Sequence, residues 1–216
     1  MGTVAWVIPI SSVIAFIIVA LGRNASRKLP LITLTATIVG FISFAIVANT
    51  LLQEGTQSFE ITWLETKEAI LMWGITLDPL TVTMLGLITL TAAGVQLYSL
   101  VYMENDPRFN WYFAVHSLFL AAMITLVLAN NLILIYIAWE LVGACSYLLI
   151  GFWWEKRSAA EAAKKAFITT RIGDVGLLIG IVLLFNETQT FNLSEIFTAA
   201  SNGAIDQTTI TLSTLL

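Results

Sequence analysis

Three charged residues stand inside long apolar stretches of this sequence. Glu140 lies in one stretch, and Arg171 and Asp174 lie three residues apart in a later one. A charge at the centre of a lipid bilayer costs about 2.5–3.5 kcal/mol on insertion scales, so such residues face a bundle interior or a hydrated path. The chemistry open to them there is ion pairing or the uptake and release of protons.

Each of these residues also has a structural explanation. Arg171 and Asp174 are spaced to share one helix face, so a structural ion pair and a functional role are equally open. Glu140 has no opposite charge within four residues, and burial of a lone carboxyl group favours its protonated form. We therefore predict proton transfer at Glu140. Histidine ordinarily titrates near neutral pH, so His116 could relay protons, or it could be a hydrogen-bonded packing residue.

The composition places these charges in a membrane protein. Hydrophobic residues make up 58% of the 216 residues, Asp, Glu, Lys and Arg together 11%, and the mean hydropathy is +0.87. The net charge of −4 gives a nucleic-acid partner no basic surface to bind. The single cysteine, Cys145, excludes an intrachain disulfide and a multi-cysteine iron–sulfur site. No nucleotide-binding or hydrolase motif occurs, so redox or hydrolytic chemistry belongs to another chain.

Six stretches are long enough to cross a bilayer, which takes about 20 apolar residues in a helix. The predicted spans are 4–21, 31–52, 79–103, 111–129, 132–153 and 163–185. Residues 208–216 are interpreted as the start of a seventh span, so residues 1–216 are expected to be the N-terminal part of a longer membrane domain. A cleavable signal peptide is an alternative for the first span, but no basic segment precedes it. The predicted fold class is an all-α membrane protein.

Basic residues gather in alternate connections between the spans. The first, third and fifth connections hold eight Lys and Arg residues, among them Lys164 and Lys165, whereas the others hold only Lys67. This asymmetry predicts that the N-terminus lies outside. Separately, we expect the membrane to be the inner (plasma) membrane of a cell rather than an organellar membrane. In the second connection apolar residues alternate around a polar turn, which predicts a short outer β-hairpin at about residues 58–77.

The motifs along the chain carry a resemblance to a known family. The segment 139–153, WELVGACSYLLIGFW, resembles the WE-x-VG-x-CSYLLIGF segment of the large antiporter-like subunit of respiratory complex I, which is subunit L or 5 of NADH–quinone oxidoreductase. Residues 164–167 (KKAF) and 171–174 (RIGD) look like its K-AF-xxx-R-x-GD stretch. Residues 77–80, 98–103 and 128–132 fit the same template in order, so the resemblance covers roughly residues 60–195.

The resemblance implies a proton-translocating subunit that couples quinone reduction to pumping through a mid-membrane relay. Glu140 would match the family's key glutamate on the fifth helix, and Lys165, Arg171 and Asp174 its sixth-helix charges; the family's paired lysine lies on a seventh helix, beyond Leu216. The chain itself would hold no cofactor. NADH, FMN, iron–sulfur clusters and quinone would belong to partner subunits, which include other antiporter-like membrane subunits.

Two departures and two alternatives accompany this resemblance. Gln96 stands where many bacterial members have a histidine, and His116 stands at a position that is usually apolar, which weakens a histidine-based path.

The large subunit of an Mrp-type cation/proton antiporter, or of an inorganic-carbon uptake complex, would share every motif described above. A structural membrane scaffold is the third reading, but it leaves the intramembrane charges unexplained.

Overall fold

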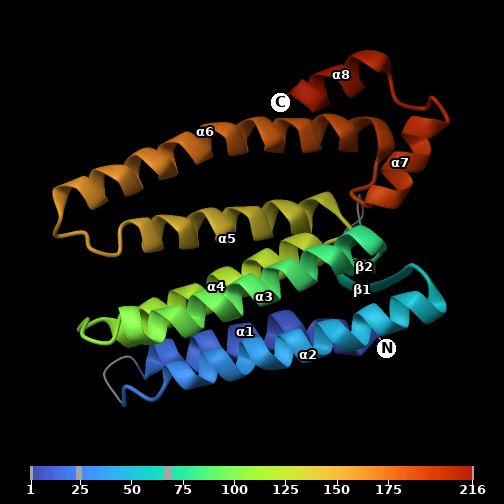
Figure 1. Cartoon of the computed structure of the whole chain (residues 1–216). Coiled ribbons are helices and arrows are strands. Elements are labelled where there is room, and N and C mark those ends of the chain that lie inside the picture. Colours follow the sequence, from blue (N-terminus) through green and yellow to red (C-terminus); the bar gives the residue numbers. More distant parts are fainter. Residues whose placement is uncertain (1, 23–25, 66–69, 216) are drawn as a thin grey trace.

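The structure of the chain is a computed structural model that describes residues 2–22, 26–65 and 70–215 (Figure 1). Its elements, in chain order, are α1 (Gly2–Leu21), α2 (Pro30–Glu54), β1 (Gln57–Glu65), β2 (Ile70–Leu77), α3 (Pro79–Tyr102), α4 (Phe109–Leu128), α5 (Leu132–Ile150), α6 (Arg157–Thr188), α7 (Leu193–Ser201) and α8 (Gln207–Leu215). Six of the described helices, α1 to α6, are long and apolar enough to cross a membrane. The predicted helical membrane fold and its hairpin are therefore confirmed.

The six long helices lie side by side, with α1 and α2 at one edge of the bundle and α6 at the other (Figure 1). Helix α4 is central and packs against α1, α3 and α5. In its most apolar stretch 56% of the residues are buried, against 17% in α5 and in α6. We call the end with the connections at 22–29, 103–108 and 151–156 the basic end, and the opposite end, with β1, β2 and α7, the hairpin end.

Two elements differ from the sequence prediction. Helix α6 begins six residues before the predicted span and ends three residues after it, because residues 157–165 are rich in Ala, Glu and Lys, which favour helix beyond the bilayer. Helix α7 was not predicted, because its nine residues are too few to span a membrane. The short helix α8 lies against α6. Whether α8 begins a seventh span stays a prediction.

The hairpin covers one end of the bundle. Strands β1 and β2 are antiparallel, with Gln57 opposite Leu77 and Phe59 opposite Ile75. The apolar alternation of β2 reflects burial, since Ile75 and Leu77 belong to the core formed by α1 to α4. On β1 the alternation reflects burial only at Phe59, which packs against this core, because Ile61 and Trp63 are exposed. The predicted polar turn at residues 66–68 lies outside the described residues.

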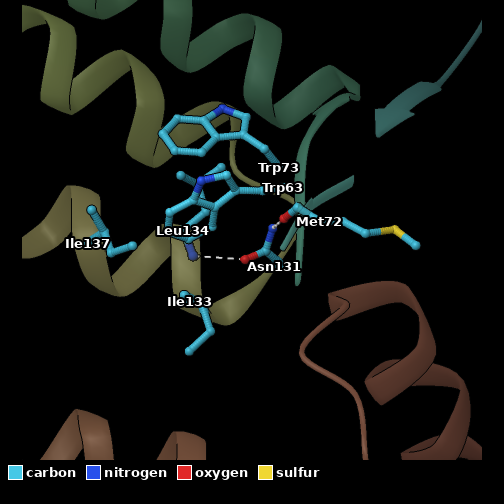
Figure 2. Close-up of a pocket in the computed structure, with 7 residues that line it drawn as sticks. All are labelled: Trp63, Met72, Trp73, Asn131, Ile133, Leu134 and Ile137. Carbon is cyan, nitrogen blue, oxygen red and sulfur yellow. Dashed lines mark hydrogen bonds between the residues drawn. The ribbon is translucent and has the colours of Figure 1, made fainter. Parts of the chain in front are cut away.

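Polar side chains tie the hairpin to the segments that begin α5 and α7. Asn131 caps α5, since its Oδ1 accepts from the backbone N–H of Leu134 at 2.8 Å and its Nδ2 donates to the Met72 carbonyl at 2.8 Å (Figure 2). One Glu60 carboxylate oxygen accepts from Asn130 at 2.6 Å and from Asn192 at 2.7 Å. The polar break that separates α4 from α5 is therefore held by hydrogen bonds to the hairpin, which fix where α5 begins.

Candidate functional site: a charged cluster between α5 and α6

Glu140, Arg171 and Asp174 meet between α5 and α6. Glu140 is eight residues, about 12 Å of helix, from the first residue of α5. Asp174 is 14 residues, about 21 Å, from the end of α6, which extends beyond the bilayer. These distances agree with the prediction that both carboxyl groups lie well inside the apolar layer. The sequence predicted this depth for each residue but not that the three side chains touch.

The Arg171 guanidinium connects the two carboxylates. Its Nη1 forms an ion pair with the Glu140 carboxylate, and its Nη2 donates to the Glu140 carbonyl at 3.3 Å. Its Nε lies 3.5 Å from Asp174 Oδ2. The expectation that Glu140 lacks a nearby counter-ion was therefore wrong, because the search along the sequence covered one helix while the partner comes from the next helix. The Arg171–Asp174 pair expected from their spacing is present as well.

Asp174 also has a partner on α5. It is 4% exposed, and the indole Nε1–H of Trp139 donates to its Oδ1 at 2.8 Å. Sequence reasoning treated Trp139 only as part of the family motif and missed this role. The available signal was its position directly before Glu140, which places the two side chains about 100° apart on α5. Two adjacent residues of α5 thus hold two charged residues of α6.

A glycine makes room for the arginine. A Cβ at Gly143 would lie 2.8 Å from Arg171 Nη2, closer than van der Waals contact allows. Gly143 is one turn from Glu140 on the same helix, so the close approach of the guanidinium to α5 depends on the absence of a side chain there. The Glu140 and Arg171 side chains are 26% and 27% exposed, so the pair is only partly covered by the described residues.

The other predicted residues lie apart from this cluster. Lys165 is exposed and lies six residues, about 9 Å, from Arg171 toward the basic end. Lys164 is exposed as well and pairs with Glu161 at 3.6 Å. His116 is buried on α4, where its Nδ1 lies 3.4 Å from Gln96 Nε2. No contact among the described residues joins Lys165 or His116 to Glu140, Arg171 or Asp174.

The cluster has the charge balance of a proton site. Two carboxylates share one guanidinium, so binding one proton to either acid makes the group neutral, which is favourable in a medium of low polarity. Among the residues that the structure describes, no group of three or more His, Cys, Asp and Glu side chains could hold a metal ion. The arrangement is suited to holding and releasing a proton while its cation changes partner.

Family models match two parts of the chain. Residues 63–113 match the N-terminal region of chain 5 of NADH–ubiquinone oxidoreductase (complex I). Residues 129–216 match the membrane region shared by NADH:quinone oxidoreductases and Mrp antiporters. The second match contains Glu140, Arg171 and Asp174. The first contains β2 and α3, with part of α4.

Curated proteins with similar sequences are oxidoreductase subunits. The chloroplastic NAD(P)H-quinone oxidoreductase subunit 5 of Anthoceros angustus is 39% identical over 202 residues, which cover 89% of this chain and 28% of the relative. The F(420)H(2) dehydrogenase subunit L of Methanosarcina mazei is 43% identical, over 85% of this chain and 27% of the relative. Chain 5 of the Synechocystis NAD(P)H-quinone oxidoreductase is 37% identical, over 89% of this chain and 30% of the relative. The chain thus spans less than a third of the length of these relatives.

Solved structures share the fold. A chain of the archaeal membrane-bound sulfane sulfur reductase matches with a TM-score of 0.82 at 15% identity, covering 97% of this chain and 42% of the other. A chain of the Mrp complex from Dietzia sp. matches with a TM-score of 0.78 at 21% identity, covering 99% of this chain and 22% of the other. At these identities the likeness shows the arrangement of the helices alone. The family models and the curated relatives show that the chain belongs to the family of antiporter-like membrane subunits that includes subunit 5 (L) of the NADH–quinone oxidoreductases, and that it corresponds to the N-terminal part of such a subunit.

Proposed function

We propose that the chain is part of a proton-translocating membrane subunit of an NAD(P)H–quinone-oxidoreductase-type complex, and that Glu140, Arg171 and Asp174 form its relay in this region. The observation that carries the proposal is the Arg171 guanidinium placed between an acid on α5 and an acid on α6. The curated relatives support the kind of complex. Quinone reduction and its cofactors would belong to partner subunits, and other antiporter-like membrane subunits would be neighbours.

The relay works by exchange of a shared cation. Two unit charges 4 Å apart attract by about 4 kcal/mol at an effective dielectric of 20, and by about half as much at 8 Å. A shift of the guanidinium from Glu140 toward Asp174 would therefore change the proton affinity of Glu140 by roughly thirtyfold, since 1.4 kcal/mol is a factor of ten. Arg171 on Glu140 keeps that carboxylate ionised, and its withdrawal lets the acid take up a proton.

The other residues predicted for proton translocation are assigned to the proton path from their positions, not from contacts with the cluster. Lys165 lies on the same helix nearer the basic end, where a lysine would pass protons between the interface and the cluster. The lysine of a seventh helix, which the family resemblance implies, would be the second cation that attracts Glu140. His116 as a relay stays a prediction, with no described contact to the cluster. The asymmetry of basic residues supports an N-terminus outside the cell's inner membrane and a basic end in the cytoplasm.

The decisive experiment replaces Glu140 by glutamine in the assembled complex. We expect Glu140→Gln to abolish proton pumping into membrane vesicles while oxidation of NADH with an artificial acceptor continues, because the variant keeps the volume of the side chain and loses its titration. Glu161→Gln is the matched control, since Glu161 is an exposed acid of α6 that pairs with Lys164 near the basic end. Pumping at the normal rate by Glu140→Gln would end the proposal.

A cation/proton antiporter is the second candidate, because one matching family model covers Mrp antiporters as well as quinone oxidoreductases. The two functions would use the same cluster but different energy sources. Vesicles that hold the assembled complex separate them. Proton movement that requires NAD(P)H and quinone supports the oxidoreductase, and proton movement driven by a sodium gradient without an electron donor supports the antiporter.

A further inference from the structure

An apolar groove runs between α3 and α4, away from the cluster of Glu140, Arg171 and Asp174. Its volume is about 320 Å³. Its walls are apolar side chains of α3 between Met84 and Val95 and of α4 between Phe119 and Met123. The stretch of α3 that lines it is about 16 Å long. Leu87 and Val95 are exposed, so the groove opens on the outer surface of the bundle.

A buried hydrogen-bond donor faces this apolar groove. His116 lines the groove and is 8% exposed. Its Nδ1 lies 3.4 Å from the Nε2 of Gln96, which can only donate, so Nδ1 accepts and the ring proton is on Nε2. The other end of the Gln96 amide is held by Thr37, whose hydroxyl donates to Oε1 at 3.1 Å. No described residue accepts from His116 Nε2. A donor left without a partner in apolar surroundings costs free energy, so the groove favours an occupant with an acceptor.

The groove continues toward the basic end along an aromatic stripe. Tyr98 and Tyr102 follow Val95 at helical spacing, are exposed, and stack on each other with ring centroids 5.5 Å apart. Exposed tyrosines at a helix end are typical of the membrane–water interface. His116 is level with Gln96, which lies about 7 Å inside the hydrocarbon core when α3 is centred in a layer about 30 Å thick. The donor therefore lies in the half of the core on the side of the basic end, about 7 Å below the level at which phospholipid ester carbonyls border the core.

The charge at this end favours an anionic molecule. Among the described residues, the connections at the basic end and the adjoining turns of α6 hold seven Lys and Arg residues against four acids, Glu104, Asp106, Glu155 and Glu161. Arg27 lies at the end of α3, where its guanidinium donates to the Glu104 carbonyl. A surplus of cations where helices leave the membrane attracts anionic headgroups.

We propose that this groove binds an anionic phospholipid from the leaflet at the basic end. One acyl chain lies along α3 and α4, and an ester carbonyl oxygen accepts from His116 Nε2–H. An alkyl chain alone would fill the groove but leave the donor unsatisfied, whereas an acyl ester supplies the apolar chain and the acceptor together. This binding site uses none of Glu140, Arg171 and Asp174, so either proposal can fail without the other.

Photo-crosslinking in the reconstituted complex tests the site. The probe is a phosphatidylglycerol with a photoreactive group on one acyl chain, in vesicles of phosphatidylcholine, and crosslinked peptides are mapped by mass spectrometry. We expect labelling of α3 within residues 84–95 and of α4 within residues 116–123. Thr91→Trp fills the groove and should remove most of this labelling. Leu90→Trp is its matched control, because Leu90 is exposed on the same helix but does not line the groove.

The donor is tested by a pair of variants at one position. A neutral hydrogen bond contributes about 0.5–1.5 kcal/mol, so His116→Leu should lower labelling roughly three- to tenfold, while His116→Gln, which keeps a donor, should retain more of it. Equal labelling of the unchanged chain and Thr91→Trp would overturn the proposal. So would crosslinks from the groove to another protein chain, or labelling by a photoreactive quinone in place of the lipid. Equal labelling by a phosphatidylcholine probe would overturn the anionic preference.

Discussion

The two halves of the bundle handle buried polar groups in opposite ways. In α1 to α4 the only residue among Asp, Glu, Lys and Arg is Glu54, at the end of α2. The polar groups inside these helices are neutral and join one helix to another, as Ser117 does by donating to the Ser12 carbonyl at 2.9 Å. In α5 and α6 the buried polar groups are charged, and few residues cover them.

This contrast separates architecture from activity. A neutral hydrogen bond between helices removes the cost of a buried polar group and has no charge to change, so it holds one arrangement. The Arg171 guanidinium between α5 and α6 can change partner, because it lies close to the carboxylates of both Glu140 and Asp174 and each of them attracts it. We infer that changes in α1 to α4 act on stability, whereas changes between α5 and α6 act on proton movement.

The largest effect is expected from Arg171→Gln. Removing one member of a buried ion pair costs about 3–5 kcal/mol, and the lower end applies because a quarter of each side chain is exposed. Two acids without a cation would then take up protons and stay protonated. Thermal unfolding of the assembled complex and pumping in vesicles measure the two consequences. Arg157→Gln, at the first and exposed residue of α6, is the control. Unchanged pumping by Arg171→Gln would remove the distinction between the halves.

A smaller change at the same site is Gly143→Ala. The added methyl group would push the guanidinium away from α5, which costs about 1–3 kcal/mol in a packed site, and it should lower pumping more than stability. Gly94→Ala on α3 is the matched control, because nothing lies within 4 Å of a Cβ there. Pumping rates and thermal unfolding are compared for both variants. Equal pumping by the two would show that the position of Arg171 does not limit the relay.

The smallest effect is expected in the neutral half, from Gln96→Leu. His116 would lose its donor, at a cost of about 1 kcal/mol, while the Thr37 hydroxyl can turn to the Thr33 carbonyl, which lies 3.0 Å away. The complex should unfold at a slightly lower temperature and pump at the normal rate per assembled complex. A large loss of pumping with unchanged stability would instead place His116 and Gln96 in the proton path, and the neutral half would no longer be only structural.

The features that the sequence could predict are local ones. The six spans, the break at Asn130 and Asn131 and the hairpin follow from hydropathy and alternation within short windows. The ion pair between Glu140 and Arg171 does not, because it depends on how α5 is rotated against α6. The hydrogen bonds that Glu60 accepts were missed for the same reason, since the donors Asn130 and Asn192 are far away along the chain. Helix α7 was missed because nine residues carry too short a pattern.

The hydrogen bond from Trp139 to Asp174 gives the charged cluster an optical reporter of its own. The emission of an indole ring depends on the electric field across it, and a proton arriving at or leaving the bonded carboxylate changes that field. The chain has seven tryptophans, so the contribution of this ring would be the difference between the spectra of the unchanged chain and Trp139→Phe. Charge movement in the interior of the membrane could then be followed in real time by fluorescence, without attaching a dye.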